Sequence, residues 1–361
     1  SLVPSLDASV TVDLRNAIEF PGGANAVGID GEPYVYVGLW SSPTVERWDL
    51  QADGSLRRGP SISFANLGVT DTSSVAFTPI VSRNKSYFAD YTGAKLVTWN
   101  PAAMEAVGTI ELPLENEGAL VPVLMSYLTV RDDSVLVNSF MNDLDDGTKY
   151  SDRSRLLAID TRTDEVVSVD EWVGCEKMQL AGQTSDGTAY YTADNSRTFV
   201  RHVLGAGYGA AACGLRVVPS GKTFDQGYNV DLRQLVGGRP VVGDMMVVSD
   251  TLAFLRVWHE EDVPQAVTLE NFQDVYATTP AFHWWTWEIG SSAAREIPDQ
   301  VPQAGFADRF SVDGRTFVVD NSLIKDDAGG SAPFIELTPS GELRRALTGK
   351  GQVGGTIFRV R

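Results

Sequence analysis

Short stretches in which apolar and polar residues alternate recur along the chain, with tight-turn residues between them. The clearest copies are YVYVGLW…TVERWDLQADGSLRRG, KSYFADYTGAKLVTWNPAAMEAVGTIEL and SVLVNSF…RLLAIDTRTDEVVSVD, and fainter ones begin at TLAFLRVW and RTFVVDN. Alternation with a period of two is typical of strands with one buried face. A strand unit that returns at a similar spacing predicts a β-propeller, because one small sheet cannot bury both faces and must stack on its neighbours.

Each repeat predicts one blade, with strands a to d counted from the ring axis outward. Strands b and c are the best defined, at 34–40 and 44–50, 86–91 and 95–100, 134–140 and 155–160, 188–194 and 215–219, 252–258 and 284–289, and 316–321 and 333–338. Asp53-Gly54 predicts a c–d hairpin, because this pair readily takes positive φ angles. No long helical periodicity competes with the strands.

Three further strand-like segments remain near the chain ends, at 2–6, 10–14 and 356–360. A propeller closes by building its last blade from both ends of the chain, which removes free sheet edges. We therefore predict an all-β fold in which residues 1–361 form a single seven-bladed propeller domain. A six-bladed ring is the alternative.

The connections from strand b to strand c are short in the first two repeats and long in the last four. In this topology all b–c loops emerge on one face, together with the d–a crossings between blades. Long loops on a rigid scaffold commonly carry function. Cys175 falls in a d–a crossing and Cys213 in a b–c insertion, so we predict a disulfide that pins the fourth insertion; two buried thiols are the alternative.

Histidines and aromatic residues gather near these long loops. His202, His259 and His283 are the three histidines of the chain, and Trp40, Tyr91, Phe140 and Trp258 end strand b in their repeats. We predict a ligand site on the loop face. In it Trp40, Tyr91, Trp258 and Trp284 stack on the ligand, while Arg153, Arg201, His202, His259 and His283 meet its charged oxygens.

The formal net charge of −18 disfavours nucleic acid and anionic membranes as partners. No stretch reaches the roughly 18 to 20 apolar residues that span a bilayer. The chain opens directly in strand-like sequence, and we expect a targeting segment upstream of Ser1.

Asp143, Asp145 and Asp146 resemble calcium ligands, but their spacing fails the EF-hand register, so a solvated acidic loop is preferred; Asp326-Asp327 is a weaker candidate.

The segments NAVGIDGEPYVYVGLWSSPTVERWDLQADGSLRRG and RLLAIDTRTDEVV resemble bacterial surface-lipoprotein propellers that accompany siderophore receptors, of the MxcI-like and xenosiderophore-binding types. The resemblance covers most of the chain and lies in the style of the repeat. It implies a seven-bladed propeller outside the cytoplasm that binds a ferric siderophore or passes it to an outer-membrane transporter. Ferric catecholates are anionic, and Lys149, Arg153, Arg155 and Arg201 supply positive charge in or beside the insertions.

Three functional hypotheses follow. The first is a non-enzymatic binding protein for an iron chelate or similar small molecule, attached to the membrane only through a lipid anchor upstream of Ser1; Fe³⁺ would arrive with the ligand. The second is a protein-interaction module whose partner is a TonB-dependent outer-membrane receptor. The third is a metal-dependent hydrolase or lactonase, with Ca²⁺ or Zn²⁺ held by Asp194, Asn195, Asp320 and Asn321 at the ends of strand b.

Overall fold

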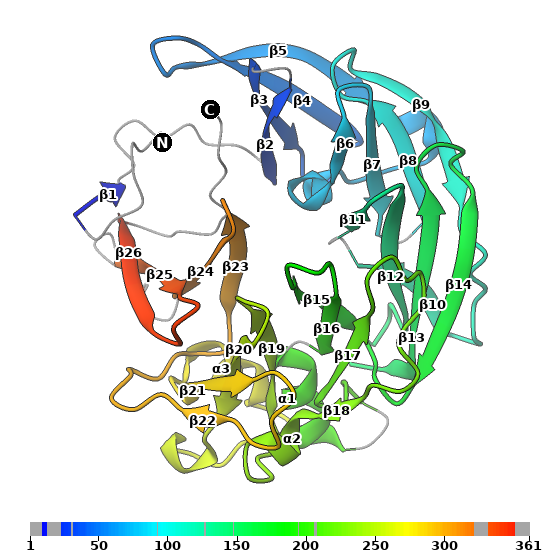
Figure 1. Cartoon of the computed structure of the whole chain (residues 1–361). Helices are drawn as coiled ribbons and strands as arrows, with labels where there is room; N and C mark the ends of the chain where they lie inside the picture. Colours follow the sequence, from blue (N-terminus) through cyan, green and yellow to red (C-terminus); the bar gives the residue numbers. More distant parts are fainter. Residues whose placement is uncertain are drawn as a thin grey trace. The chain divides into compact units, whose positions relative to one another are not determined.

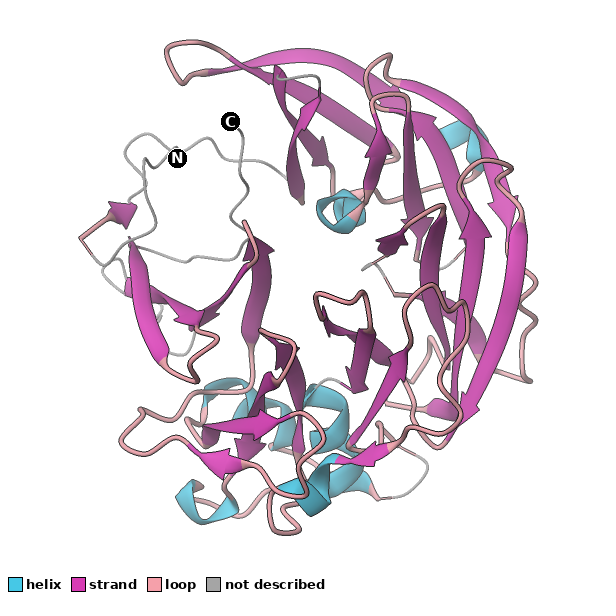
Figure 2. Cartoon of the chain, in the orientation of Figure 1, coloured by secondary structure: helices cyan, strands magenta, loops and turns pink. Residues whose placement is uncertain are grey.

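The chain forms six sheets, each built mainly from strands that follow one another in the sequence. This computed structural model describes residues 9–12, 23–29, 32–91, 93–125, 128–146, 148–193, 195–205, 208–320 and 331–350. Strands dominate these residues, and the helices are short (Figure 2). Successive antiparallel sheets in chain order are the blades of a β-propeller, so the predicted all-β propeller class is confirmed (Figure 1).

The first two sheets and most of the third belong to one compact unit, the amino-terminal unit, made of residues in 18–144 and 155–171. Their strands are β2 (Ala24–Ile29), β3 (Glu32–Gly38), β4 (Thr44–Leu50) and β5 (Leu56–Ser63); β6 (Ile80–Ser82), β7 (Lys85–Asp90), β8 (Lys95–Asn100) and β9 (Glu105–Glu111); and β10 (Val121–Leu124), β11 (Thr129–Arg131), β12 (Ser134–Asn142), β13 (Tyr150–Asp160) and β14 (Val166–Val173). Two short 3₁₀ helices, η2 (Ala65–Leu67) and η3 (Ser73–Phe77), lie between the first two sheets in the sequence.

The last three sheets belong to a second compact unit, the carboxy-terminal unit, made of residues 145–154 and 172–350 together with β1 (Thr11–Val12). Its strands are β15 (Met178–Gln183), β16 (Ala189–Ala193), β17 (Cys213–Val217) and β18 (Val230–Asp231); β19 (Val242–Val247), β20 (Leu252–Trp258), β21 (Phe282–Glu288) and β22 (Arg295–Glu296); and β23 (Ala307–Val312), β24 (Arg315–Asp320), β25 (Ser331–Leu337) and β26 (Leu343–Lys350).

Within the carboxy-terminal unit, apolar side chains from neighbouring sheets pack together. One cluster joins the fourth and fifth sheets through residues such as Tyr190, Met245 and Trp287. Another joins the fifth and sixth through Phe254, Trp284 and Val318. The inner parts of the blades are buried on both faces, as in β16, where every residue is buried. This is the stacking that the repeat predicts, because each sheet buries its faces against its neighbours.

The prediction of seven blades is wrong, and six sheets are present in the described part of the chain. The sixth repeat supplies four strands of its own, β23 to β26. The N-terminal β1 does not begin another blade but pairs in parallel with β26, Thr11 opposite Thr348. Because the edge of β26 takes up this strand, no seventh sheet is needed to cover it. The segments 2–6 and 356–360 lie outside the described residues, and the single-domain assignment stays a prediction.

The long b–c connections of the fourth and fifth blades contain helices that the strand periodicity did not predict. The fourth holds α1 (Asn195–Leu204), and the fifth holds the 3₁₀ helix η4 (Glu260–Asp262) and α3 (Phe272–Thr278). A further short helix, α2 (Leu232–Leu235), follows β18. Among the described helices, none is long and apolar enough to cross a membrane.

The predicted disulfide is confirmed. Cys175 and Cys213 are bonded, with their Cα atoms 6.0 Å apart across a separation of 38 residues. A disulfide of this kind persists in an oxidising compartment, which fits a protein outside the cytoplasm.

Candidate functional site

Helix α1 forms one wall of the candidate site. Its sequence NSRTFVRHVL places Asn195, Thr198 and Phe199 on a buried face, at the spacing of one side of a helix. Phe199 meets the indole of Trp258 edge-on, with ring centroids 5.0 Å apart, and lies 5.3 Å from the ring of Tyr276 in α3. These contacts fix the helix on the fifth blade and leave Arg201 and His202 beside its buried stripe.

The d–a crossing that leads into the fourth blade braces this wall. Glu176 is 3% exposed, and its carboxylate accepts a hydrogen bond from Arg201 Nη1 at 3.0 Å and from the backbone N–H of Ala211 at 2.7 Å. The preceding residue, Cys175, is bonded to Cys213. Two consecutive residues of the crossing therefore tie α1 to the segment that returns to β17.

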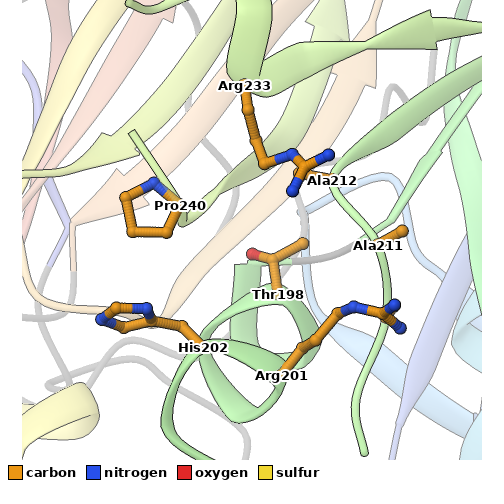
Figure 3. A pocket seen from close by; sticks show the side chains of 8 residues that line it. Thr198, Arg201, His202, Ala211, Ala212, Arg233 and Pro240 are labelled. Atoms are coloured by element: carbon orange, nitrogen blue, oxygen red, sulfur yellow. The ribbon is translucent and has the colours of Figure 1, made fainter. Parts of the chain in front are cut away.

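A cavity of about 310 Å³ lies between these elements. Thr198, Arg201 and His202 line it from α1, Arg233 from α2, and Pro240 from the segment before β19, and Ala210, Ala211 and Ala212 complete the lining. Figure 3 shows the labelled side chains, with Arg233 across the cavity from the residues of α1. The three alanines leave the space that longer side chains would fill.

The guanidinium group of Arg233 is held in place by its own helix cap. Asp231 accepts the backbone N–H of Arg233 at 3.0 Å, Nε at 2.9 Å and Nη2 at 2.7 Å. The hydrogen bond from this side chain lowers the pKa of Asp231. This contact holds the Arg233 side chain in one conformation and occupies its Nε and Nη2 groups, so a ligand oxyanion would meet Nη1.

A second cluster of polar side chains lies in the fifth blade. His259 follows β20, Asp262 ends η4 and His283 lies in β21, and one potential ligand atom from each falls within 4.8 Å of the others. The register explains the meeting: His283 is opposite Val257, and His259 comes two residues later on the same face. In the turn of η4 the backbone N–H of Asp262 donates to the carbonyl of His259 at 3.1 Å. This turn places the Asp262 carboxylate beside the two imidazoles.

The two imidazoles of this cluster lie face to face. Their ring centroids are 3.7 Å apart and their planes differ by 14°. Burial lowers the pKa of His259, and the nearby His283 and Arg239 lower it further. The Arg239 guanidinium pairs with both oxygens of Glu261, at 2.7 and 3.0 Å, and holds the pKa of that carboxyl down at about 2.

The two clusters are neighbours in the sequence and in space. His202, which lines the cavity, has its Nε2 4.0 Å from a carboxylate oxygen of Glu260 in η4. Arg239 precedes Pro240, another lining residue. The structure therefore brings four predicted site residues into one region of the carboxy-terminal unit: Arg201, His202, His259 and His283.

The two tryptophans predicted beside them are in the core. Trp258 and Trp284 are each 1% exposed. Trp258 packs between Phe199 and Phe282, and Trp284 packs against Phe254 of the neighbouring strand. Neither indole reaches the surface to stack on a ligand. The indole that faces the histidines is Trp285, whose Nε1 lies 3.4 Å from His259 Nε2.

The remaining predicted contact residues do not line the cavity. Trp40 and Tyr91 belong to the amino-terminal unit and are 68% and 44% exposed. In the carboxy-terminal unit, Arg153 pairs with Asp152 at 3.5 Å and Lys149 with Asp146 at 3.2 Å. Arg155 of the amino-terminal unit pairs with Glu117 and Glu171. Their assignment to a ligand stays a prediction.

The acidic candidates are only partly described. Asp146 accepts hydrogen bonds from the N–H and hydroxyl of Thr148, which lower its pKa and stabilise a turn. Asn195 is fully buried at the start of α1. Asp194, Asn321, Asp326 and Asp327 lie outside the described residues, as does the side chain of Asp320, so Ca²⁺ binding and the lactonase set stay predictions.

Several residues of both clusters were not predicted from the sequence: Thr198, Glu176 and Arg233 around the cavity, and Asp262 and Glu296 around the histidines. The only sequence signal for the second group is the acidic run Glu260-Glu261-Asp262 directly after His259. Glu296 follows β21 by a hairpin, and no local pattern distinguishes it from an ordinary surface acid.

Comparison with known proteins agrees on the fold. No protein-family model matches the sequence, and neither does a curated protein. Among solved structures, the periplasmic gluconolactonase of Pseudomonas aeruginosa superposes with a TM-score of 0.53 at 14% identity, over 92% of this chain and 86% of that one. A hypothetical selenium-binding protein from Sulfolobus tokodaii gives a TM-score of 0.52 at 9% identity, over 93% and 78%. At these identities the likeness shows a shared fold and nothing about activity.

Proposed function

We propose that this chain is a non-enzymatic, extracytoplasmic propeller that binds an anionic, oxygen-rich small molecule in the cavity between α1 and α2. Its preferred ligand class is a ferric siderophore, passed on to an outer-membrane transporter. The convergence of Arg201, Arg233 and His202 on one cavity carries the proposal, because the chain as a whole has a net charge of −18. Arg201 and Arg233 are each paired with one carboxylate, Glu176 and Asp231, and would bind an anion through their remaining N–H groups.

Three further properties support this choice. The cavity volume of about 310 Å³ is at the lower end of the range for small-molecule sites, enough to hold one arm of a larger chelate. The disulfide stabilises the insertion that forms the cavity and fits an oxidising compartment. The propeller resemblance noted in the sequence points to the same ligand class and to a lipid anchor upstream of Ser1.

Calorimetric titration with ferric and iron-free siderophores of the catecholate and hydroxamate types tests the proposal. We expect saturable binding of a ferric form with a submicromolar Kd, a free energy of about −8 kcal/mol or better. Arg233→Gln should weaken it by about tenfold or more. Arg201→Lys keeps the charge beside Glu176 but loses the planar fork, and should weaken binding less.

Arg295→Gln is the matched control, because it removes an exposed arginine of the same unit that does not line the cavity. Its affinity should equal that of the wild type. Absence of saturable heat with both siderophore types, or equal loss in Arg295→Gln and Arg233→Gln, would contradict the proposed site. Capture of a membrane receptor without any ligand would then favour the protein-interaction hypothesis.

A further inference from the structure

His283 is held between two carboxylates. Its Nδ1 lies 2.8 Å from Glu296 Oε1, and its Nε2 lies 2.6 Å from Asp262 Oδ2. An ionised carboxylate only accepts hydrogen bonds, and a neutral imidazole has a single N–H to donate. If that N–H serves Glu296, the lone pair of Nε2 faces the oxygen of Asp262. Two acceptors at 2.6 Å are held together by an additional proton, and a bound metal ion would replace that proton and move them apart.

Glu296 occupies the position of a supporting residue. In many metal sites the ligating histidine donates its other N–H to a carboxylate, which fixes the tautomer and raises the basicity of the ligating nitrogen. The contact from Glu296 to His283 Nδ1 leaves Nε2 directed at Asp262 in that way. The strand register sets this up, since Glu296 in β22 is paired with Trp285 of β21, two residues from His283.

His259 provides the third donor. It is 5% exposed and stacked on His283, and its Nε2 lies beside the indole N–H of Trp285. A metal bound in the ring plane of His283 would require the His259 ring to tilt out of the stack. That movement would remove the acceptor that Trp285 Nε1 faces. Both carboxylate oxygens of Glu261 pair with Arg239, so Glu261 is not counted as a ligand. The candidate metal ligands are then two imidazoles and one carboxylate.

We propose that His259, Asp262 and His283 bind a divalent transition-metal ion of the zinc type, with Glu296 supporting His283. Two imidazoles and a carboxylate suit Zn²⁺ and its neighbours, whereas Ca²⁺ and Mg²⁺ prefer oxygen ligands only. In a tetrahedral zinc site the ligand atoms lie about 3.4 Å apart. On binding, His283 Nε2 and Asp262 Oδ2 must therefore move apart from 2.6 Å, while His259, whose ligand atom lies within 4.8 Å of theirs, moves closer by side-chain rotation. The partly exposed Asp262 leaves the site open to ions from solvent.

The test begins with purified protein that has been treated with a chelator and dialysed. This protein is titrated with ZnCl₂, and binding is measured by calorimetry. We expect one Zn²⁺ per chain, and a change in tryptophan fluorescence that disappears in Trp285→Phe. His283→Gln should abolish binding, and Asp262→Asn should weaken it strongly. Glu296→Gln removes no ligand and should still weaken binding about 10- to 100-fold.

Asp274→Asn is the matched control: it removes an exposed carboxylate from the same insertion, at the start of α3, and should bind Zn²⁺ like the wild type. Circular dichroism of each variant verifies that the fold is retained, and Glu296→Gln remains decisive if His283→Gln does not fold. No saturable binding of Zn²⁺, or binding unchanged in both Glu296→Gln and His283→Gln, would overturn the proposal.

Discussion

The indole ring of Trp258 meets the phenyl ring of Phe199 edge-on, with ring centroids 5.0 Å apart. This contact joins the end of β20 in the fifth blade to α1 in the insertion of the fourth. Because α1 also carries Arg201 and His202, the position of the cavity depends on a packing contact in the core. Trp258 therefore supports the cavity indirectly, by packing against the helix that carries two of its lining residues.

Replacing Trp258 should destabilise the protein, because this side chain lies in the core and not in a ligand contact as the sequence predicted. Removing a fully buried tryptophan typically costs about 3–5 kcal/mol, because transfer free energy is lost and a cavity remains. We expect a clear fall in Tm for Trp258→Ala in thermal unfolding. Trp40→Ala is the matched control, since Trp40 is 68% exposed and its loss should change stability by less than about 0.5 kcal/mol. Equal Tm values for both variants would show that Trp258 does not carry this packing.

Gly209 allows the closest backbone approach to α1. It has φ +62°, and an added Cβ would lie 2.1 Å from the carbonyl oxygen of Arg197 and 2.6 Å from the nitrogen of Arg201. Gly209→Ala must therefore push the loop that carries Ala210 to Ala212 away from the helix and distort the cavity. We expect a lower Tm and weaker binding of the cavity ligand, measured by thermal unfolding and calorimetry.

Gly205→Ala controls for backbone strain. Gly205 also has positive φ, at +91°, but the structure describes no atom within 4 Å of an added Cβ. Both substitutions carry the conformational penalty of about 1–2 kcal/mol for a left-handed non-glycine residue. The difference between the two variants then isolates the steric contact. If Gly205→Ala proves as harmful as Gly209→Ala, close approach to α1 is not the reason for the glycine.

The regular part of the fold could be predicted from the sequence because alternation is a local property. The predicted ranges 44–50, 95–100 and 252–258 coincide with β4, β8 and β20. Asp53-Gly54 forms its hairpin turn, with Gly54 at φ +84°. The blade count was missed because the sequence assigned segment 10–14 to a separate seventh blade, whereas β1 pairs with β26 of the sixth, a partner that no local pattern identifies.

The candidate site was predictable only in part. In β21, with the sequence FHWWTWE, apolar residues occupy both faces, so alternation cannot tell that Trp284 points into the core while His283 and Trp285 share the other face. Helix α1 has ten residues, and much of its burial comes from Trp258 and Tyr276, which are distant in sequence. Glu296 acquires its role only through the register of β22.

Glu336 should make the sixth blade sensitive to acid. Its side chain is 5% exposed and accepts two hydrogen bonds from Arg315, at 2.8 Å each, and one from Arg344 Nε at 2.9 Å. The hydrogen bond from Arg315, supported by Arg344, lowers the pKa of Glu336 below its ordinary value of 4.5. A carboxyl whose pKa is lower in the folded state contributes its full stability above the unfolded pKa and loses it as the pH falls through the folded one.

Glu336→Gln should therefore reduce the free energy of unfolding by about 1.5–3 kcal/mol at neutral pH, and by much less at acid pH. Urea unfolding at pH values between about 7 and 3 measures this, because the wild type should lose stability between about pH 5 and 3 while the variant loses less. Glu342→Gln, an exposed acid on the turn before β26, should follow the wild type at every pH. The free energies of unfolding of wild type and Glu336→Gln can diverge with pH only if Glu336 binds protons differently in the folded and unfolded states. Parallel dependences on pH would therefore mean that the two arginines do not stabilise the ionised carboxylate.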